Sequence, residues 1–156
     1  MSKIDREEAS LDASTDLLEK AETGHLAMCR EGEPYVVPIS FVYDDGRLFF
    51  HGSTSGKKVD FITANPRVCF AVEESELVPG PDPCKLHFRF RSTLAGGIAR
   101  VVEDIDEQVE ALRLLAEKYS PGSGHLMNRQ RVESYDDLGI IEVAVDEITT
   151  REEPSE

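Results

Sequence analysis

The chain has 156 residues and a formal net charge of −14 at pH 7, with 31 acidic residues against 17 lysines and arginines. This length predicts one domain, and a hydrophobic content of 40% argues against both a disordered chain and a membrane protein. The acidic balance argues against a nucleic-acid partner, whose phosphates would be repelled over most of the surface. No apolar run reaches the roughly 20 residues of a membrane-spanning helix, so no membrane partner is expected.

The ends of the chain and its cysteines predict a single cytoplasmic domain. The polar, acidic start lacks the apolar core of a signal peptide, and Cys29, Cys69 and Cys84 cannot all pair within the chain. We therefore expect reduced thiols, with Cys29 and Cys69 as small core residues because they fall in strand patterns. The domain is predicted to span residues 12–150, between a mobile tail at 1–11 and an acidic tail at 151–156.

The first half of the chain predicts a short helix followed by an antiparallel meander. Ser14 or Thr15 can cap the helix, and Gly24 is placed to end it. In the second strand apolar side chains take alternate positions, as in a strand with one packed face. A strong turn signal, Asp44-Asp45-Gly46, joins it to the third strand. The predicted strands are residues 25–30, 34–43 and 47–51.

A second helix and two further strands follow. Asn65-Pro66 stops the helix, because proline disfavours helical geometry in the residue before it. The next strand is a continuous apolar run, which is typical of a strand buried on both faces. The long strand after it should bend at Gly96-Gly97, since adjacent glycines in strands mark bulges or barrel corners. The helix is residues 57–64, the strands are 68–72 and 86–102, and a loop is predicted at 77–83.

The last third of the chain has the clearest helical pattern. Asp104 and Glu107 approximate a capping box, and one apolar stripe runs from there to Pro121-Gly122. A loop then leads to a final alternating strand at 138–150. Five or six antiparallel strands with three helices predict a mainly β fold, a small closed barrel with helices packed outside it.

Residues 49–58, FFHGSTSGKK, place small polar residues before the second helix. Backbone N–H groups at a helix N-terminus bind anions, and glycines allow a close approach. The hydroxyls of residues 53–55 and the charges of Lys57 and Lys58 would add to such a site, for which phosphate is the simplest ligand. The glycine spacing fits neither a P-loop nor a dinucleotide fingerprint. The alternative is an ordinary glycine-rich turn with solvated lysines.

The long strand carries a second group of cations. His87, Arg89 and Arg91 share one face, because side chains alternate along a strand. These arginines either pair with carboxylates or bind an anion. Cys84 and His87 could form half of a metal site, but no second pair has suitable spacing, so no metal is expected.

Residues 24–150 resemble the pyridoxamine 5′-phosphate oxidase-related family of FMN-binding split barrels, and within it the nitroimidazole-resistance (Nim) group. The blocks that carry the resemblance are GHLAMC, PYVVPISFVYDDGRLFFHG, GKKVDFITANPRVCFAV and FRFRSTLAGGIARVVED. The resemblance implies a six-stranded antiparallel split barrel with flanking helices. It also implies a homodimer that binds two FMN molecules at the subunit interface.

The same resemblance implies roles for individual residues. Lys58 matches the lysine that family members place on the FMN phosphate, with Lys57 as the basic residue before it and Ser55 as a further phosphate ligand. His51 matches the histidine beside the flavin in Nim-like proteins. Phe90 departs from the pattern, because many relatives have tyrosine there. The flavin would be lined by Val37, Pro38, Ile39 and Ser40, by Phe49, Phe50, His51 and Gly52, and by Arg91 or Ser92 from the partner or the facing strand.

These matches predict an FMN-dependent oxidoreductase. It would take electrons from NAD(P)H or another donor and pass them to a small organic acceptor such as a nitroaromatic, with His51 as the catalytic residue that orients the acceptor. His51 could instead be a strand-end histidine bonded to a carbonyl. The alternative functions are a non-catalytic flavin- or haem-binding protein, with His51 as haem ligand, and an enzyme like pyridoxamine phosphate oxidase.

Overall fold

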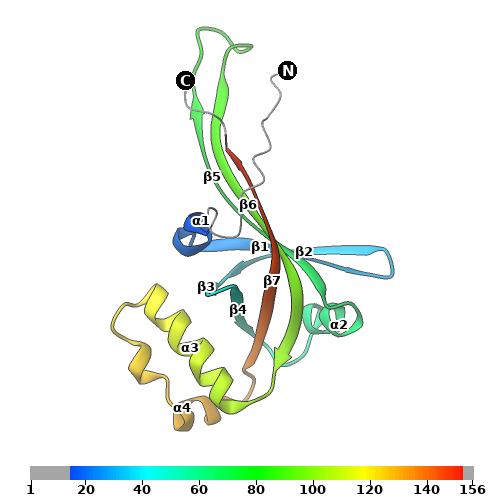
Figure 1. The fold of residues 1–156 in the computed structure, drawn as a ribbon, viewed down its shortest axis with the longest axis vertical. Coiled ribbons are helices and arrows are strands. Elements are labelled where there is room, and N and C mark those ends of the chain that lie inside the picture. The colour runs from blue at the N-terminus through cyan, green and yellow to red at the C-terminus, as the bar shows by residue number, and fades with distance from the viewer. Residues whose placement is uncertain (1–14, 153–156) are drawn as a thin grey trace.

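The computed structural model describes residues 15–152 (Figure 1), so the tail predicted at 1–11 lies outside the described residues. All of the strands belong to one antiparallel sheet of seven strands in the order β2-β1-β5-β6-β7-β4-β3. The elements are α1 (Asp16–Lys20), β1 (Thr23–Arg30), β2 (Glu33–Ser40), β3 (Val42–Asp44), β4 (Arg47–Gly52), α2 (Lys57–Ala64), β5 (Arg67–Val78), β6 (His87–Val102), α3 (Ile105–Tyr119), η1 (Gly124–Leu126), α4 (Arg129–Glu133) and β7 (Gly139–Glu152).

A break at Phe41 gives the sheet its shape. The strand predicted at 34–43 is divided there, so that β2 pairs with β1 while β3 pairs with β4. Because β2 and β3 are the two edges of the sheet, one residue connects the edges and the sheet has to curl round. The edges are not hydrogen-bonded to each other in the described chain. The mainly β split barrel is thus confirmed, whereas the continuous meander, the count of six strands and the full closure were wrong.

The core has two parts, one on each side of β4. Phe41, Phe50 and Phe70 meet inside the curled sheet, with ring centroids 4.6 Å apart for Phe41 and Phe70 and 5.3 Å apart for Phe50 and Phe70. Phe49 points to the opposite face, because neighbouring side chains of a strand alternate. There it packs with residues of α3 in a second buried cluster. The two adjacent phenylalanines therefore anchor β4 from both sides.

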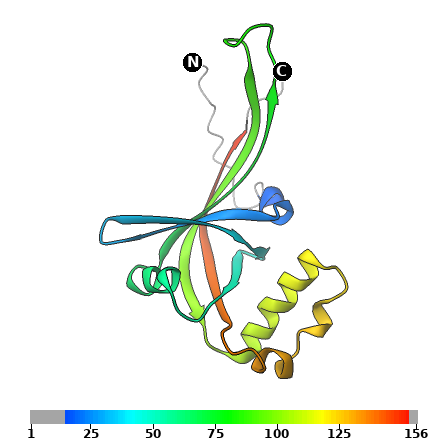
Figure 2. The same cartoon turned by 180° about the vertical axis from the view of Figure 1, so that it is seen from behind.

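The two longest strands, β6 and β7, carry the predicted glycine bulge. The register of β6 against β7 shifts between Gly96 and Gly97, leaving Asp146 as the extra residue of β7. A Cβ atom on Gly97 would overlap the Ala144 carbonyl oxygen, so the close approach of the two strands requires glycine. Beyond the barrel, β5 and β6 continue together as a long arm (Figures 1 and 2).

Several predicted boundaries differ from the structure because tertiary pairing extends the strands. β5 continues to Val78, into the predicted loop, because it pairs with β6 along its whole length. β7 continues to Glu152, so Arg151 and Glu152 belong to a strand that pairs with Ser92 and Arg91 instead of to a tail. The loop predicted between α3 and β7 contains η1 and the short helix α4.

Three predictions of local environment were also wrong. Gly24 does not end α1. It lies within β1, where a Cβ atom would overlap the Phe70 ring. Residues 67–72 alternate between buried and less buried positions, so this part of β5 is covered fully on one face only. Cys29 is exposed and Cys69 only half-buried, because both lie on the outer face; with Cys84 they are free thiols.

The end of α3 is attached to the break at Phe41. The Lys118 ammonium donates to the carbonyl oxygens of Ala21 at 2.6 Å and Phe41 at 2.8 Å. The Tyr119 hydroxyl accepts from the Phe41 N–H at 2.9 Å and donates to the Glu22 carbonyl at 2.6 Å. Burial lowers the pKa of Lys118 to about 8. These bonds hold α3 against the barrel. No helix within residues 15–152 is long and apolar enough to cross a bilayer.

Candidate functional site

The first part of the candidate site is the turn from β4 into α2. Gly56 precedes the helix with φ 125°, a conformation that favours glycine. Gly52 ends β4, and a Cβ atom there would lie 3.2 Å from the Lys58 Nζ atom. The Lys58 side chain therefore folds back over Gly52, to a place that a larger residue at 52 would crowd.

The two lysines at the start of α2 have different surroundings. Lys57 lies 3.9 Å from a carboxylate oxygen of Glu33, and its ammonium sits 4.4 Å from the centre of the Tyr35 ring. Lys58 is half-buried and forms no ion pair within residues 15–152. Burial lowers the pKa of Lys58. Since the first N–H groups of a helix also lack partners, Lys58 and the start of α2 together fit a bound anion such as a phosphate.

The hydroxyl groups of the glycine-rich turn face a carboxylate instead. Ser53 and Thr54 both donate to Asp137 at 2.6 Å, and the Thr54 N–H donates to it at 2.9 Å. These donors lower the pKa of Asp137 to about 2. The Ser53 and Thr54 hydroxyls, which were expected to bind an anionic ligand, therefore bind the Asp137 side chain in this structure. The exposed Ser55 remains next to the start of α2, with its N–H 3.4 Å from the Ser53 hydroxyl.

His51 lies on the other face of β4. The position next to it, Gly52, faces Lys58, so alternation turns the His51 side chain away from the anion site. It borders a pocket of about 460 Å³ between the end of β4, α3 and the segment before β7. Apolar walls of this pocket are Leu112, Leu115, Ala116, Met127 and Leu138. The structure thus brings Lys58 and His51 to the same strand end, but on opposite sides.

The remaining predicted residues of β2 and β4 lie near the inner core, except Phe49, which packs in the second cluster. Val37 and Ile39 pack against the inner cluster, Pro38 between them is exposed, and Ser40 at the end of β2 is half-buried. Phe49 and Phe50 are 2% and 0% exposed, so their side chains are enclosed by protein. Any ligand contact by these two phenylalanines would have to be through the backbone.

Arg91 and Ser92 are not brought to the anion site within one chain. The helix α2 leads into β5 at Arg67, which pairs with Ile98, whereas Arg91 pairs with Glu74, seven residues further along β5 on the arm. Arg91 lies 3.8 Å from a carboxylate oxygen of Glu74, and Arg89 lies 3.8 Å from Glu76. Of the two readings of these cations, the structure therefore shows pairing with carboxylates.

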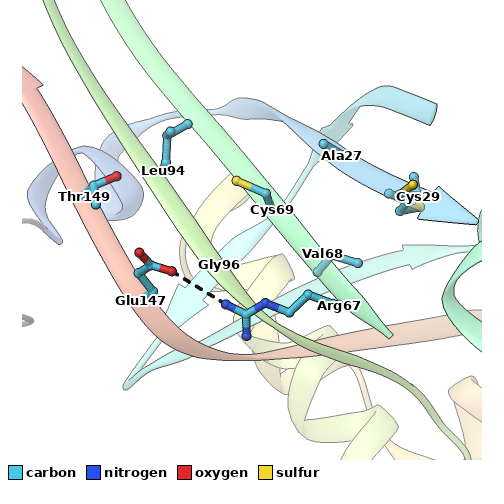
Figure 3. A pocket seen from close by; sticks show the side chains of 10 residues that line it. Ala27, Cys29, Arg67, Val68, Cys69, Leu94, Gly96, Glu147 and Thr149 are labelled. Atoms are coloured by element: carbon cyan, nitrogen blue, oxygen red, sulfur yellow. Dashed lines mark ion pairs between the residues drawn. The ribbon is translucent and has the colours of Figure 1, made fainter. Parts of the chain in front are cut away.

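A second pocket, of about 440 Å³, opens on the outer face of β1, β5, β6 and β7 (Figure 3). Arg67 bonds to Asp146 and lies 3.7 Å from Glu147, while the Cys69 side chain projects beside Leu94. Burial raises the pKa of the Cys69 thiol, which keeps it protonated. Within the described residues, no group of three or more histidine, cysteine, aspartate and glutamate side chains gathers as a metal site.

Two functional features could not be read from the sequence. Asp137 reaches Ser53 from 84 residues away in the chain, so no local spacing indicates their bond. The pocket beside His51 uses the α3 residues Leu112, Leu115 and Ala116, whose helical spacing indicates only a face that packs on a core. The sole sequence signal for that pocket was His51 itself.

Comparisons with known proteins agree with this fold. A 24% identical protein of Bacteroides thetaiotaomicron, assigned provisionally to 5-nitroimidazole antibiotic resistance, superposes with a TM-score of 0.72 over 86% of this chain and 79% of its own. The FAD and heme binding protein of Mycobacterium smegmatis is 20% identical and has a TM-score of 0.79, over 96% of this chain and 74% of its own. At these identities the two structures establish a shared fold.

Two sequence comparisons identify a relative and the family of this chain. An uncharacterized protein of Rhizobium meliloti is 36% identical over 53 residues. The match covers 34% of this chain and 34% of that relative. The family model described as pyridoxamine 5′-phosphate oxidase matches residues 10–152. Because this match covers nearly the whole sequence, the chain belongs to the pyridoxamine 5′-phosphate oxidase family.

Proposed function

We propose that this protein is an FMN-dependent oxidoreductase that passes electrons from NAD(P)H or another donor to a small organic acceptor, such as a nitroaromatic. Membership of the family and the shared fold with flavin- and nitroimidazole-related proteins support the proposal. The single observation that carries it is Lys58, a half-buried cation that lies over Gly52 at the start of α2.

Each group in the turn would have a distinct task. Lys58, Ser55 and the first N–H groups of α2 would hold the FMN phosphate. The backbone of residues 37–40 and of residues 49–52 would line the flavin. When bound, FMN would supply the redox chemistry, and the protein would supply placement and electrostatics. His51 would donate a hydrogen bond that orients the acceptor, which makes it the proposed catalytic residue.

A homodimer with two FMN molecules at its interface is part of the proposal. Arg91 and Ser92 pair with Glu74 and Glu73, at least six residues along β5 from its start beside α2, so they could reach a flavin only on a second copy. The outer face of the sheet offers an apolar surface for that copy, with Val36, Leu94 and Ile98 exposed by 59%, 42% and 45%. Soluble monomers rarely leave such residues grouped on one face.

The phosphate assignment is tested by comparing Lys58→Ala with Lys57→Ala. A charge-assisted hydrogen bond contributes about 1.5 to 3 kcal/mol, so Lys58→Ala should raise the Kd for FMN by about 10- to 100-fold. Lys57→Ala removes the same charge from a lysine that already faces Glu33, and should raise the Kd no more than about 3-fold. Titration of flavin-free protein with FMN, followed by fluorescence, measures both. Equal effects of the two variants would refute the assignment of Lys58.

The role of His51 is tested by His51→Ala. This variant should bind FMN with unchanged affinity, because the side chain lies on the face of β4 away from Lys58. Its turnover of a nitroaromatic with NADPH should fall by about 100-fold, the lower range of contributions from a positioned acid-base group. Unchanged turnover would remove His51 from the mechanism while leaving the cofactor assignment in place.

A further inference from the structure

The pocket beside His51 has the form of a small-molecule site. Its volume of about 460 Å³ falls within the usual range of ligand pockets, and its walls are mostly apolar. The polar residues at its border, besides His51, are Tyr119, Tyr135, Asp136 and Asp137. A few polar groups around an apolar body are what fixes the orientation of a small ligand.

The charged groups at this border are of one sign. Asp136 and Asp137 both line the pocket, whereas no lysine or arginine of the described chain does. The donors Ser53 and Thr54 are uncharged, so they stabilise the Asp137 carboxylate without neutralising it. The border therefore attracts cations and repels anions, apart from any charge that His51 itself carries.

Three cations of α3 and α4 are held by other partners. Arg113 donates to the Met127 carbonyl at 2.8 Å, and Arg131 donates to the Tyr135 hydroxyl at 3.0 Å. Lys118, whose ammonium lies 5.3 Å from the centre of the Tyr119 ring, donates to the carbonyl oxygens of Ala21 and Phe41. An anion in the pocket would have to compete for these groups while facing Asp136 and Asp137. The cation at this strand end, Lys58, lies on the opposite face of β4.

We propose that this pocket binds the electron acceptor and selects small aromatic molecules that are neutral or positively charged over phosphorylated ones. The inference rests on the proposed function for the identity of the ligand as acceptor, but the binding preference stands on the pocket alone. This binding preference argues against pyridoxamine phosphate as the substrate, because no lysine or arginine within residues 15–152 lines the pocket to bind its phosphate.

A charge series on one aromatic body tests this preference directly. The probes are benzylamine, benzyl alcohol and benzyl phosphate, added to the full chain saturated with FMN so that the anion site at Lys58 is occupied. Methyl-13C-methionine labelling gives at most three signals, because the chain has three methionines. Met127 lines the pocket, whereas Met28 lies in β1. The Met127 signal therefore reports binding beside His51, and the Met28 signal, which comes from the wall of the second pocket, reports any binding there separately.

We expect benzylamine and benzyl alcohol to shift the Met127 signal with Kd values at least 10-fold lower than that of benzyl phosphate. Asp136→Asn should weaken benzylamine by about 3-fold and leave benzyl alcohol unchanged, since an exposed charge contributes only weakly to the binding of a cation. Glu19→Gln, which removes an exposed acid on α1, is the matched control and should change neither. Ala116→Leu should fill the pocket and weaken all three probes.

Two outcomes would overturn the proposal: benzyl phosphate binding as tightly as benzylamine, or no probe shifting Met127 in the unmodified protein. Neither depends on whether the variants fold. The result also separates this inference from the proposed function. A protein that takes up no FMN but still shows the expected preference at Met127 refutes the function and keeps the pocket. A protein that reduces an acceptor with FMN while Met127 stays unmoved keeps the function and refutes the pocket.

Discussion

The two faces of β4 differ at its end. On one face, the half-buried Lys58 at the start of α2 lies over Gly52. On the other face, His51 borders an apolar pocket whose edge carries two aspartates. Adjacent positions, His51 and Gly52, separate these two environments, because side chains alternate along a strand. One strand end can thus serve an anionic ligand and a neutral or cationic ligand without mixing their charges. Because each face has its own residues, a mutation on one face should leave the other face unchanged.

The largest effect on stability is expected at Gly97, where β6 and β7 approach closely within the barrel that supports both faces. Gly97→Ala would place a Cβ atom against the Ala144 carbonyl and 2.9 Å from Val143 Cγ1. Because the backbone atoms cannot move aside cheaply, we expect a loss of about 3 kcal/mol in the free energy of unfolding, measured in urea. Both binding sites should then be lost together as the protein unfolds.

Gly32→Ala is the control for this variant. Gly32 has φ 79° in the turn between β1 and β2, and a Cβ atom added there would meet no atom within 4 Å. Only backbone strain is added at this position, so the loss should be about 1 kcal/mol. If Gly97→Ala were no worse than Gly32→Ala, β6 and β7 would not approach as closely as described.

The next effect concerns the face that carries His51. Lys118→Met would leave the Ala21 carbonyl without its donor and would leave the Phe41 carbonyl with the Tyr119 hydroxyl alone, which should lower the free energy of unfolding by about 1 to 2 kcal/mol. Because α3 forms a wall of the pocket, benzylamine binding should weaken while FMN binding is retained. Lys20→Met, which removes an exposed pair with Asp16, should cost about 0.5 kcal/mol or less. Equal losses in the two variants would contradict the attachment of α3 through Lys118.

A smaller and more local effect is expected on the face that carries Lys58. In Gly52→Ala the new methyl group would lie 3.2 Å from Lys58 Nζ, so the flexible lysine has to shift by a few tenths of an ångström. We expect the Kd for FMN to rise by about 3- to 10-fold, equivalent to about 1 kcal/mol. The Met127 signal should respond to benzylamine as in the unmodified protein. A loss of benzylamine binding here would show that the two faces are not independent.

The smallest effect concerns the bond between the turn and the segment before β7. The folded-state pKa of Asp137 is lowered from 3.8 to about 2, so its stabilising contribution is fully present above pH 3.8 and is lost as the pH falls toward 2. Asp137→Asn should therefore lower the melting temperature at neutral pH and flatten its dependence on pH across that acidic window. A slope as steep as in the unmodified protein would mean that other carboxylates cause the acid sensitivity.

Much of the fold follows from local signals in the sequence. α2 spans the predicted residues 57–64, because Asn65-Pro66 stops it, and Asp104 caps α3 by accepting from the Glu107 N–H. The glycine pair marks the bulge between β6 and β7 for a steric reason that is visible in the sequence. The break at Phe41 was not predictable, since the alternation of apolar residues continues through it. The chain breaks there because β2 pairs with β1 at one edge of the sheet and β3 pairs with β4 at the other edge.

The candidate site divides in the same way. Lys58 stands out from the sequence because a helix start and a glycine turn are both local features. The bonds from Ser53 and Thr54 to Asp137 depend on chain segments more than 80 residues apart. The surroundings of Arg91 likewise depend on its cross-strand neighbour Glu74, which sequence spacing alone does not identify. Residue type thus predicted candidates, and tertiary pairing decided which of them remain free.

The absorption spectrum of the freshly purified protein, with the released chromophore identified by mass, decides whether the chain holds FMN. We expect a flavin spectrum and released FMN. A haem spectrum would contradict this expectation and make His51 a candidate iron ligand. A colourless protein that also fails to take up added FMN would contradict it as well, and would leave Lys58 as a half-buried cation without this ligand.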